Sequence, residues 1–101
     1  MSPVAPFPRP ETVLEEAQRI THGDRRASYG HPFDDFARTG RIWGAILNVP
    51  DIPPETVGLM LEGLKVSREA FQPKRDTRVD GAGYWNTIDM VHAERLRRAG
   101  P

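Results

Sequence analysis

The sequence predicts an all-α fold, a compact bundle of about four helices that follows a proline-rich arm. Apolar residues recur at steps of three and four in four separate segments, which is the spacing of one helix face. No segment shows the alternation of apolar and polar residues that is typical of a half-buried strand. Prolines stand near the ends of the helical segments, where they do not break a helix.

The chain begins with an arm, residues 1–10, that carries prolines at positions 3, 6, 8 and 10. This arm is expected to be extended, because proline fixes φ and lacks a backbone N–H. Pro10 suits the first position of a helix, and the carboxylate of Glu11 favours the positive end of the helix dipole. We therefore expect a single helical domain over residues 11–101.

The first two helices are predicted from their apolar stripes. The first covers residues 11–22, on a face formed by Val13, Ala17 and Ile20. Gly23 is expected to cap its C-terminal end. The second covers residues 32–47, with the stripe Phe33, Phe36, Gly40, Trp43 and Leu47. Glycines weaken a helix by about 1 kcal/mol, so Gly40 and Gly44 are expected to be there to let another helix approach closely.

The other two helices follow a loop with three prolines, residues 48–54. The third helix is predicted over residues 55–71. The fourth is expected to begin near residue 79 or 80 and to end at residue 98, before the stop formed by Gly100 and Pro101. A second polar loop is expected between them, with the sequence Lys74-Arg75-Asp76-Thr77-Arg78.

The composition excludes several classes of protein. Lys and Arg together number 14, as do Asp and Glu, so the overall charge does not favour duplex DNA and we expect no sequence-specific DNA partner. The chain has no cysteine, which removes disulfides, thiol catalysis and thiolate metal sites. No apolar run approaches the roughly 20 residues that span a bilayer, and the N-terminus lacks a secretion signal. We expect a cytoplasmic protein with no membrane partner.

The chain is also short for a stable monomer. A domain of this size buries only roughly 60–70% of the surface that its unfolded chain exposes. An assembly that covers more apolar surface would add stability. We therefore expect a homo-oligomer.

The segment of residues 22–32 carries more hydrogen-bonding groups than a plain helix connection needs. Arginine binds phosphate oxygens through charge-assisted hydrogen bonds, and tyrosine stacks on a nucleobase. The segment therefore predicts one wall of a site for an anionic ligand, with the candidates His22, Asp24, Arg25, Arg26, Tyr29 and His31.

Charged residues interrupt the apolar stripes of the last two helices. Val57, Met60, Leu61, Leu64 and Phe71 are predicted to form the buried face of the third helix, with Arg68 in its middle and Lys65 at its edge. Asp80 shares a face of the fourth helix with Tyr84. A buried charge is costly unless it is paired, so Arg68 and Asp80 are expected to face a ligand or each other. Lys74 and Arg75 add two cations for phosphate.

Two metal-binding interpretations arise. The spacing of His22, Asp24 and His31 matches no closed zinc site. Asp76 and Asp80 are candidates to hold Mg²⁺, the one cofactor that the pattern admits, if ligand phosphates supply further oxygens. The alternative is that Asp80 caps the fourth helix. No catalytic residue is assigned.

The chain resembles a family of small proteins of unknown function from actinobacteria and their phages. The matching pieces span roughly residues 13–88: Glu15-Glu16-Ala17, Thr21-His22-Gly23-Asp24-Arg25-Arg26, Tyr29-Gly30-His31-Pro32, Phe36, Trp43, Lys65-Val66-Ser67-Arg68, Lys74-Arg75-Asp76 and Asp80-Gly81-Ala82-Gly83-Tyr84. The Tyr-Gly, Lys-x-x-Arg and Asp-x-x-Gly-Tyr elements are also similar to the phage nucleotide-modification-associated domain 1. That resemblance implies a role around phage nucleotides, and a phage protein would act in the host cytoplasm.

A more distant resemblance is to the all-α nucleotide pyrophosphohydrolases of the MazG type, which hold magnesium with paired glutamates. This chain departs from them, because no Glu-x-x-Glu pair stands on the helix that carries Lys65 and Arg68. Glu62 and Glu69 are seven residues apart, which places in doubt catalysis of that type.

Three functional hypotheses follow. The first is a phage-type protein that binds, and sequesters, a nucleotide or a nucleotide-derived signal, with Tyr29 or Tyr84 on the base. The second is a Mg²⁺-dependent nucleotide pyrophosphohydrolase or nucleotide-modification enzyme that uses the same pocket. The third is a structural oligomer whose charges form internal salt bridges.

Overall fold

A computed structural model describes residues 9–100 and contains five helices and no strand within that range. They are α1 (Val13–His22), α2 (Asp24–Tyr29), α3 (Pro32–Leu47), α4 (Pro54–Phe71) and α5 (Arg75–Ala99). The prediction of an all-α fold is confirmed. Most of the arm lies outside the described residues, and its last two, Arg9 and Pro10, are exposed and not helical.

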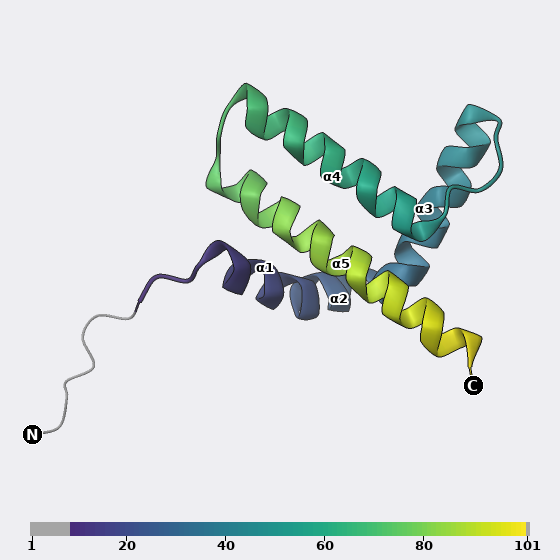
Figure 1. The fold of residues 1–101 in the computed structure, drawn as a ribbon, viewed down its shortest axis with the longest axis horizontal. Helices are drawn as coiled ribbons and strands as arrows, with labels where there is room; N and C mark the ends of the chain where they lie inside the picture. Colours follow the sequence, from purple (N-terminus) through teal and green to yellow (C-terminus); the bar gives the residue numbers. More distant parts are fainter. Residues whose placement is uncertain (1–8, 101) are drawn as a thin grey trace, which may run out of the picture.

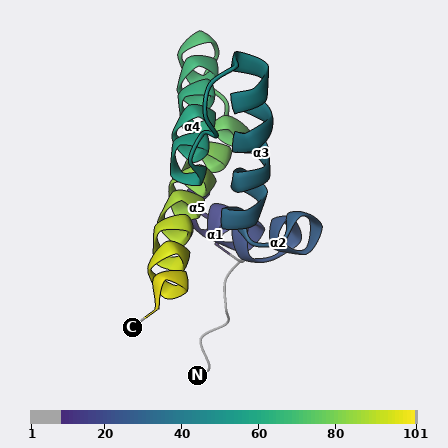
Figure 2. The same cartoon turned by 90° about the vertical axis from the view of Figure 1, so that its right-hand side faces the viewer.

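The long helix α5 organises the molecule (Figure 1). It runs antiparallel to α4, to which it is joined by a short turn, and it packs against α1 on another side. Helix α3 lies beside α4, as the view turned by 90° makes clear (Figure 2). Helix α2 follows α1 directly, so residues far apart in the sequence meet where α1, α2 and α5 come together.

Helix α1 begins at Val13 because a capping box fixes its start. The Thr12 hydroxyl accepts a hydrogen bond from the Glu15 N–H (3.1 Å), and the Glu15 carboxylate accepts one from the Thr12 N–H (2.9 Å). The helix therefore starts two residues later than predicted. Gly23 caps its C-terminal end as expected, with its N–H on the carbonyl of Arg19.

The segment of residues 22–32, which we expected to be a loop, contains the short helix α2. Gly23 is both the C-cap of α1 and the N-cap of α2, and Gly30 ends α2 at a φ of 76°. A positive φ favours glycine, which has no Cβ to clash with the backbone. Gly23 thus separates α2 from α1, and Gly30 separates it from α3, so that α2 is only about one and a half turns long.

Helix α5 begins at Arg75, four residues before the earliest predicted start. The carboxylate of Glu69, near the end of α4, accepts hydrogen bonds from the Lys74 N–H (3.0 Å) and from Arg78 (2.7 Å). These bonds tie the two helices across the turn. The predicted polar loop over residues 74–78 is therefore mostly helix. The interpretation of Asp80 as a helix cap is wrong, because Asp80 lies in the second turn of α5.

The core lies where α3, α4 and α5 meet. Phe36, Val57 and Val91 are fully buried there, and Phe33, Trp43, Ile52, Leu61 and Tyr84 pack around them. Gly40 permits the loop after α3 to cross it closely: a Cβ at Gly40 would lie 1.9 Å from the Ile52 carbonyl oxygen. The close approach expected of this glycine is therefore made by a loop.

The predicted buried face of α4 is largely wrong. Only Val57 of that stripe is fully buried, whereas Met60 and Leu64 are each 44% exposed and Phe71 is 90% exposed. Helix α5 packs instead on the side of Gly58, where a Cβ would lie 2.5 Å from the Ile88 side chain. The glycine lets α5 approach on that side, so the more apolar side of α4 faces away from the core. None of the helices in residues 9–100 is both long and apolar enough to cross a bilayer.

Candidate functional site

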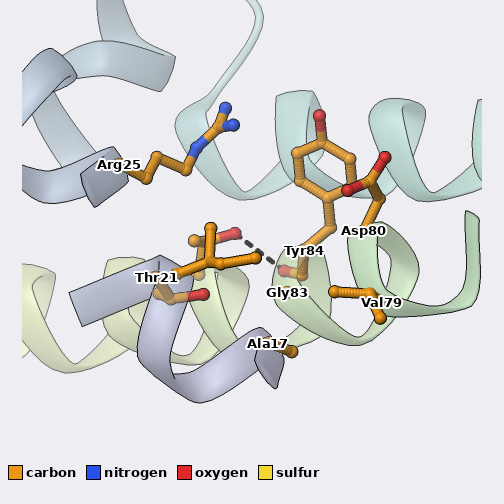
Figure 3. Close-up of a pocket in the computed structure, with 9 residues that line it drawn as sticks. Ala17, Thr21, Arg25, Val79, Asp80, Gly83 and Tyr84 are labelled. Carbon is orange, nitrogen blue, oxygen red and sulfur yellow. Dashed lines mark hydrogen bonds between the residues drawn. The ribbon is translucent and has the colours of Figure 1, made fainter. Parts of the chain in front are cut away.

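A small pocket lies where α1, α2 and α5 meet (Figure 3). Its cavity volume is about 40 Å³, and its polar lining comes from Thr21, Arg25, Asp80, Tyr84 and Thr87. Ala17, Ile20, Val79 and Gly83 complete the walls. The Thr87 hydroxyl donates to the Tyr84 backbone carbonyl (2.9 Å). The Tyr84 ring lies on the pocket side (Figure 3).

Arg25 is the most unusual side chain of this pocket. Its guanidinium carbon lies 5.2 Å from the centre of the Tyr29 ring and 5.5 Å from the centre of the Tyr84 ring. Such cation–π contacts are each worth about 0.5–1 kcal/mol and hold the planar group by its faces. No acceptor within residues 9–100 pairs with its N–H groups, so they remain available at the pocket (Figure 3).

A half-buried ion pair borders the pocket. The Lys65 ammonium donates to the Asp80 carboxylate at 2.8 Å, and the Lys65 side chain is only 14% exposed. Asp80 is half exposed and lines the pocket together with Arg25. The structure thus brings together five predicted candidates from three helices: Arg25, Tyr29, Lys65, Asp80 and Tyr84.

Arg68 is not part of this group. It is exposed, and Asp80 pairs with Lys65 in its place, so the expected buried Arg68–Asp80 contact is wrong. The reason is that α5 packs on the side of α4 that carries Gly58. The face of α4 that carries Arg68 therefore lies at the surface. Arg68 and Lys74 border another groove, with Phe71, on the far side of α4.

The remaining cations near the turn serve the fold. Arg75 donates to the carboxylate of Glu16 (3.1 Å) and to the carbonyl of Glu11 (2.8 Å), which ties α5 to the start of α1. Asp76 is exposed in the first turn of α5, where a carboxylate favours the helix dipole. Within residues 9–100, no three His, Asp or Glu side chains gather into a possible metal site.

The other candidates of the first segment lie apart from the pocket. His22, Asp24 and Arg26 are exposed. His31 caps α3, because its Nδ1 accepts a hydrogen bond from the Phe33 N–H (3.0 Å). Burial lowers the pKa of His31, although the Glu94 carboxylate lies 4.0 Å away and opposes the shift. His31 is therefore a neutral helix cap near neutral pH.

Sequence reasoning did not single out Glu62 as a site residue. Glu62 is buried between α4 and α5, and its Oε2 has no hydrogen-bond partner within the described residues. A Cβ at Gly81 would lie 2.8 Å from the other carboxylate oxygen, so the glycine makes room for this group. Burial raises the pKa of Glu62 above its ordinary value. The only signal in the sequence that could have pointed to Glu62 is its place on one helical face with Gly58, Lys65 and Glu69.

We expect the substitution Glu62→Gln to stabilise the protein at pH 7.5. A raised carboxyl pKa means that the folded state disfavours the charged form, so stability falls as the pH rises above the ordinary pKa of glutamate. An unsatisfied buried group costs about 1–3 kcal/mol, and 1 kcal/mol corresponds to roughly 4–8 °C in Tm for a domain of this size. Thermal melts at pH 7.5 and pH 4 test this, because the gain should disappear at pH 4.

The matched control is Glu69→Gln. Hydrogen bonds from the Lys74 N–H and Arg78 lower the pKa of Glu69, so its charged form supports the fold. Its substitution should therefore lower Tm at pH 7.5. A loss of stability in Glu62→Gln at that pH would mean that the buried carboxylate has a partner after all.

The chain was also compared with known proteins. Residues 12–92 match a domain of unknown function, DUF6378. The chain is similar to the Gene 55 protein of Mycobacterium phage D29, with 30% identity over 86 residues that cover 83% of this chain and 56% of that protein. The Gene 55 protein of Mycobacterium phage L5 is 32% identical over 83 residues, which cover 79% of this chain and 52% of that protein. The chain thus spans about half the length of these curated relatives. No solved structure matches it.

Proposed function

The chain belongs to the DUF6378 family, and we propose that it binds a nucleotide or a nucleotide-derived anion at the Arg25 pocket. The single observation that carries the proposal is the state of the Arg25 guanidinium. It lies within 5.5 Å of two aromatic ring centres, it lines the pocket, and its N–H groups have no acceptor within residues 9–100. A guanidinium fixed in this way loses little further freedom when it binds a phosphate.

The size of the pocket sets the mode of binding. A cavity of about 40 Å³ is little larger than the share of one water molecule in the liquid, about 30 Å³. It therefore accepts only oxygens of a phosphate, and the rest of the ligand would lie across the surface of α2. Tyr29 is 54% exposed there and would stack on the base, with the exposed Arg26 on the same helix for a second phosphate.

The Lys65–Asp80 pair would complete the recognition. Asp80 keeps one oxygen free of Lys65 and faces the pocket, so it can accept a hydrogen bond from a ribose hydroxyl or a base amino group. The hydrogen bond from Lys65 holds this carboxylate in place. A ligand held by these groups without chemical change suits sequestration of a nucleotide signal in the cytoplasm of a phage host.

The enzyme alternative rests on Asp76 and Asp80, which stand one helical turn apart on α5. Magnesium is commonly held by one or two carboxylates together with ligand phosphates and water, so the number of carboxylates does not exclude it. Asp80, however, is already paired with Lys65, and Asp76 is exposed. A metal would have to displace Lys65 from Asp80, and we derive no metal-dependent step.

A nucleotide panel separates the hypotheses. The panel contains nucleoside mono-, di- and triphosphates and cyclic dinucleotides, each at 1 mM, with and without Mg²⁺. A ligand present at 100 times its Kd stabilises the fold by about 2.7 kcal/mol, which corresponds to a rise in Tm on the order of 10 °C. Recovery of the intact ligand after denaturation supports sequestration, and recovery of a product supports an enzyme. If no compound raises Tm, the charges have only structural roles and the proposal fails.

We expect Arg25→Ala to weaken binding of any compound that the panel identifies by about 10- to 100-fold, because a hydrogen bond to a charged group contributes about 1.5–3 kcal/mol. Isothermal titration calorimetry measures the change. Arg41→Ala is the matched control, since Arg41 is an exposed arginine on α3 away from the pocket. Equal affinities for the two variants would place the ligand elsewhere.

A further inference from the structure

The outer face of α4 is almost free of charge. From Leu59 to Phe71 nine positions are exposed, and only one of them, Arg68, is charged. We call the other eight the α4 face: Leu59, Met60, Gly63, Leu64, Val66, Ser67, Ala70 and Phe71. A contiguous exposed apolar face of this kind marks an interaction site.

Many apolar side chains are exposed for a chain of this size. Within residues 9–100, thirteen large apolar side chains are exposed, whereas six apolar side chains form the buried core. Five of the thirteen lie on the α4 face: Leu59, Met60, Leu64, Val66 and Phe71. These five side chains are the apolar surface that marks the interaction site.

The pattern of the α4 face identifies its occupant. Its eight residues form two neighbouring stripes, spaced by four, three and four residues: Leu59, Gly63, Val66 and Ala70 in one, and Met60, Leu64, Ser67 and Phe71 in the other. This is the spacing of helices that pack along their length. About position 65, three of the four pairs that these stripes form in reverse order join a large residue to a small one, and the fourth joins Met60 to Phe71.

We propose that the α4 face binds the same face of a second copy of this chain, with the two α4 helices antiparallel and the two-fold axis at the level of Lys65. Residues of each stripe then face the same stripe of the second copy in reverse order. Val66 faces Gly63 of the second copy, Leu64 faces Ser67, and Leu59 faces Ala70. Large side chains thus meet small ones in the middle of the contact and along the first stripe, as close packing requires. At the ends of the second stripe the flexible Met60 side chain faces Phe71.

A parallel pair does not fit the same face. It would place Gly63 against Gly63, which leaves a gap because glycine has no side chain. Val66 would lie against Val66, where the two branched side chains would clash. It would also bring the two Arg68 side chains together, and like charges repel. In the antiparallel pair the two Arg68 residues lie about 9 Å apart along the helix axes, at opposite ends of the contact.

The groove beside α4 extends this interface onto α5. Its volume is about 490 Å³, with Val66 and Ala70 on the α4 side and Ala82 and the 57%-exposed Trp85 on the α5 side. The rest of its lining is mostly polar: Glu62, Lys65, Glu69, Thr77, Arg78 and Gly81. In an antiparallel pair the same flanks of the two copies face each other. Trp85 therefore lies where it covers the edge of the α4 contact. The pairing does not depend on the ligand site, because Arg25 lies on α2.

Cysteine cross-linking tests the register, because the chain has no cysteine of its own. The two copies of residue 66 are about 3 Å apart along the axes, and those of residue 59 are about 18 Å apart. Under mild oxidation Val66→Cys should form a covalent dimer, and Leu59→Cys alone should not. A mixture of Leu59→Cys with Ala70→Cys should cross-link, since these positions face each other. Efficient cross-linking of Leu59→Cys with itself would overturn the antiparallel register.

Light scattering after gel filtration tests the dimer itself. The protein should have twice the 11.4 kDa of the chain. The double substitution Leu64→Lys, Val66→Lys should raise the dimer dissociation constant by about 100-fold or more without loss of helix in circular dichroism, because both residues are exposed in the single chain. Leu96→Lys is the control, as Leu96 is an exposed leucine on α5 outside the face. A monomeric wild-type protein at 100 µM would overturn the proposal.

Discussion

Gly40→Ala is expected to destabilise the protein by about 3 kcal/mol or more, which lowers Tm by at least about 12 °C. A methyl group at this position would lie 1.9 Å from the Ile52 carbonyl oxygen and 3.0 Å from its carbonyl carbon. These are backbone atoms, and they cannot turn away as a flexible side chain would. The Ile52 N–H also donates to the Gly40 carbonyl (3.1 Å), so displacement of the loop would break this hydrogen bond.

Thermal unfolding followed by circular dichroism measures the effect. Gly83→Ala is the control, because a methyl group there would lie 3.6 Å from the Thr21 hydroxyl, an ordinary contact. Alanine is about 1 kcal/mol better than glycine within a helix, so Gly83→Ala should leave Tm unchanged or raise it. If Gly40→Ala melts at the wild-type temperature, the loop before α4 does not cross α3 at this point.

Phe36→Ala is expected to cost about 3–5 kcal/mol, the usual penalty for removing a buried phenylalanine side chain. Phe36 is 1% exposed and stands between Val57 and Val91, so its ring joins α3 to both α4 and α5. Because the buried core of the described residues is small, no other side chain of this size holds the three helices together. Much of the total stability of a domain of this length would be lost.

Chemical denaturation gives the free energy of unfolding for this comparison. Phe36→Leu keeps most of the buried volume and should lose clearly less stability than Phe36→Ala. Leu96→Ala is the surface control, since Leu96 is 76% exposed and should change stability by no more than about 0.5 kcal/mol. Equal losses for Phe36→Ala and Leu96→Ala would mean that the helices pack around other residues.

The family resemblance was recognisable from short motifs. The likeness to small phage proteins of unknown function agrees with the DUF6378 match and with the two mycobacteriophage relatives. The finer likenesses, to a nucleotide-modification-associated domain and to MazG-type enzymes, stay predictions. The names of the two phage relatives do not give a substrate.

The candidate site was predictable only in part. The segment of Arg25 and Tyr29 was predicted to form one wall of a ligand site, and the structure brings Arg25 against Tyr84. Asp80 was expected to face a ligand or Arg68, whereas the structure pairs it with Lys65. The two cations stand about 4.5 Å apart along the axis of α4 and about 60° apart around it. The side of α4 that packs on α5 therefore decides which of them reaches Asp80.

The sequence by itself determined four of the five helices of the described residues and where they stop, but not the short helix α2 or the start of α5. The helical spacing of apolar residues, the prolines and the glycine caps each act over a few neighbouring residues. The local sequence therefore fixes where these helices lie and where they end. Only the tertiary structure decided which side of α4 is buried. That choice depends on Gly58 of α4 and Gly81 of α5, which allow the two helices to approach closely. The contact joins residues that are far apart in the sequence, so no local pattern predicts it. The same choice leaves the α4 face exposed, and it places Lys65 rather than Arg68 beside Asp80.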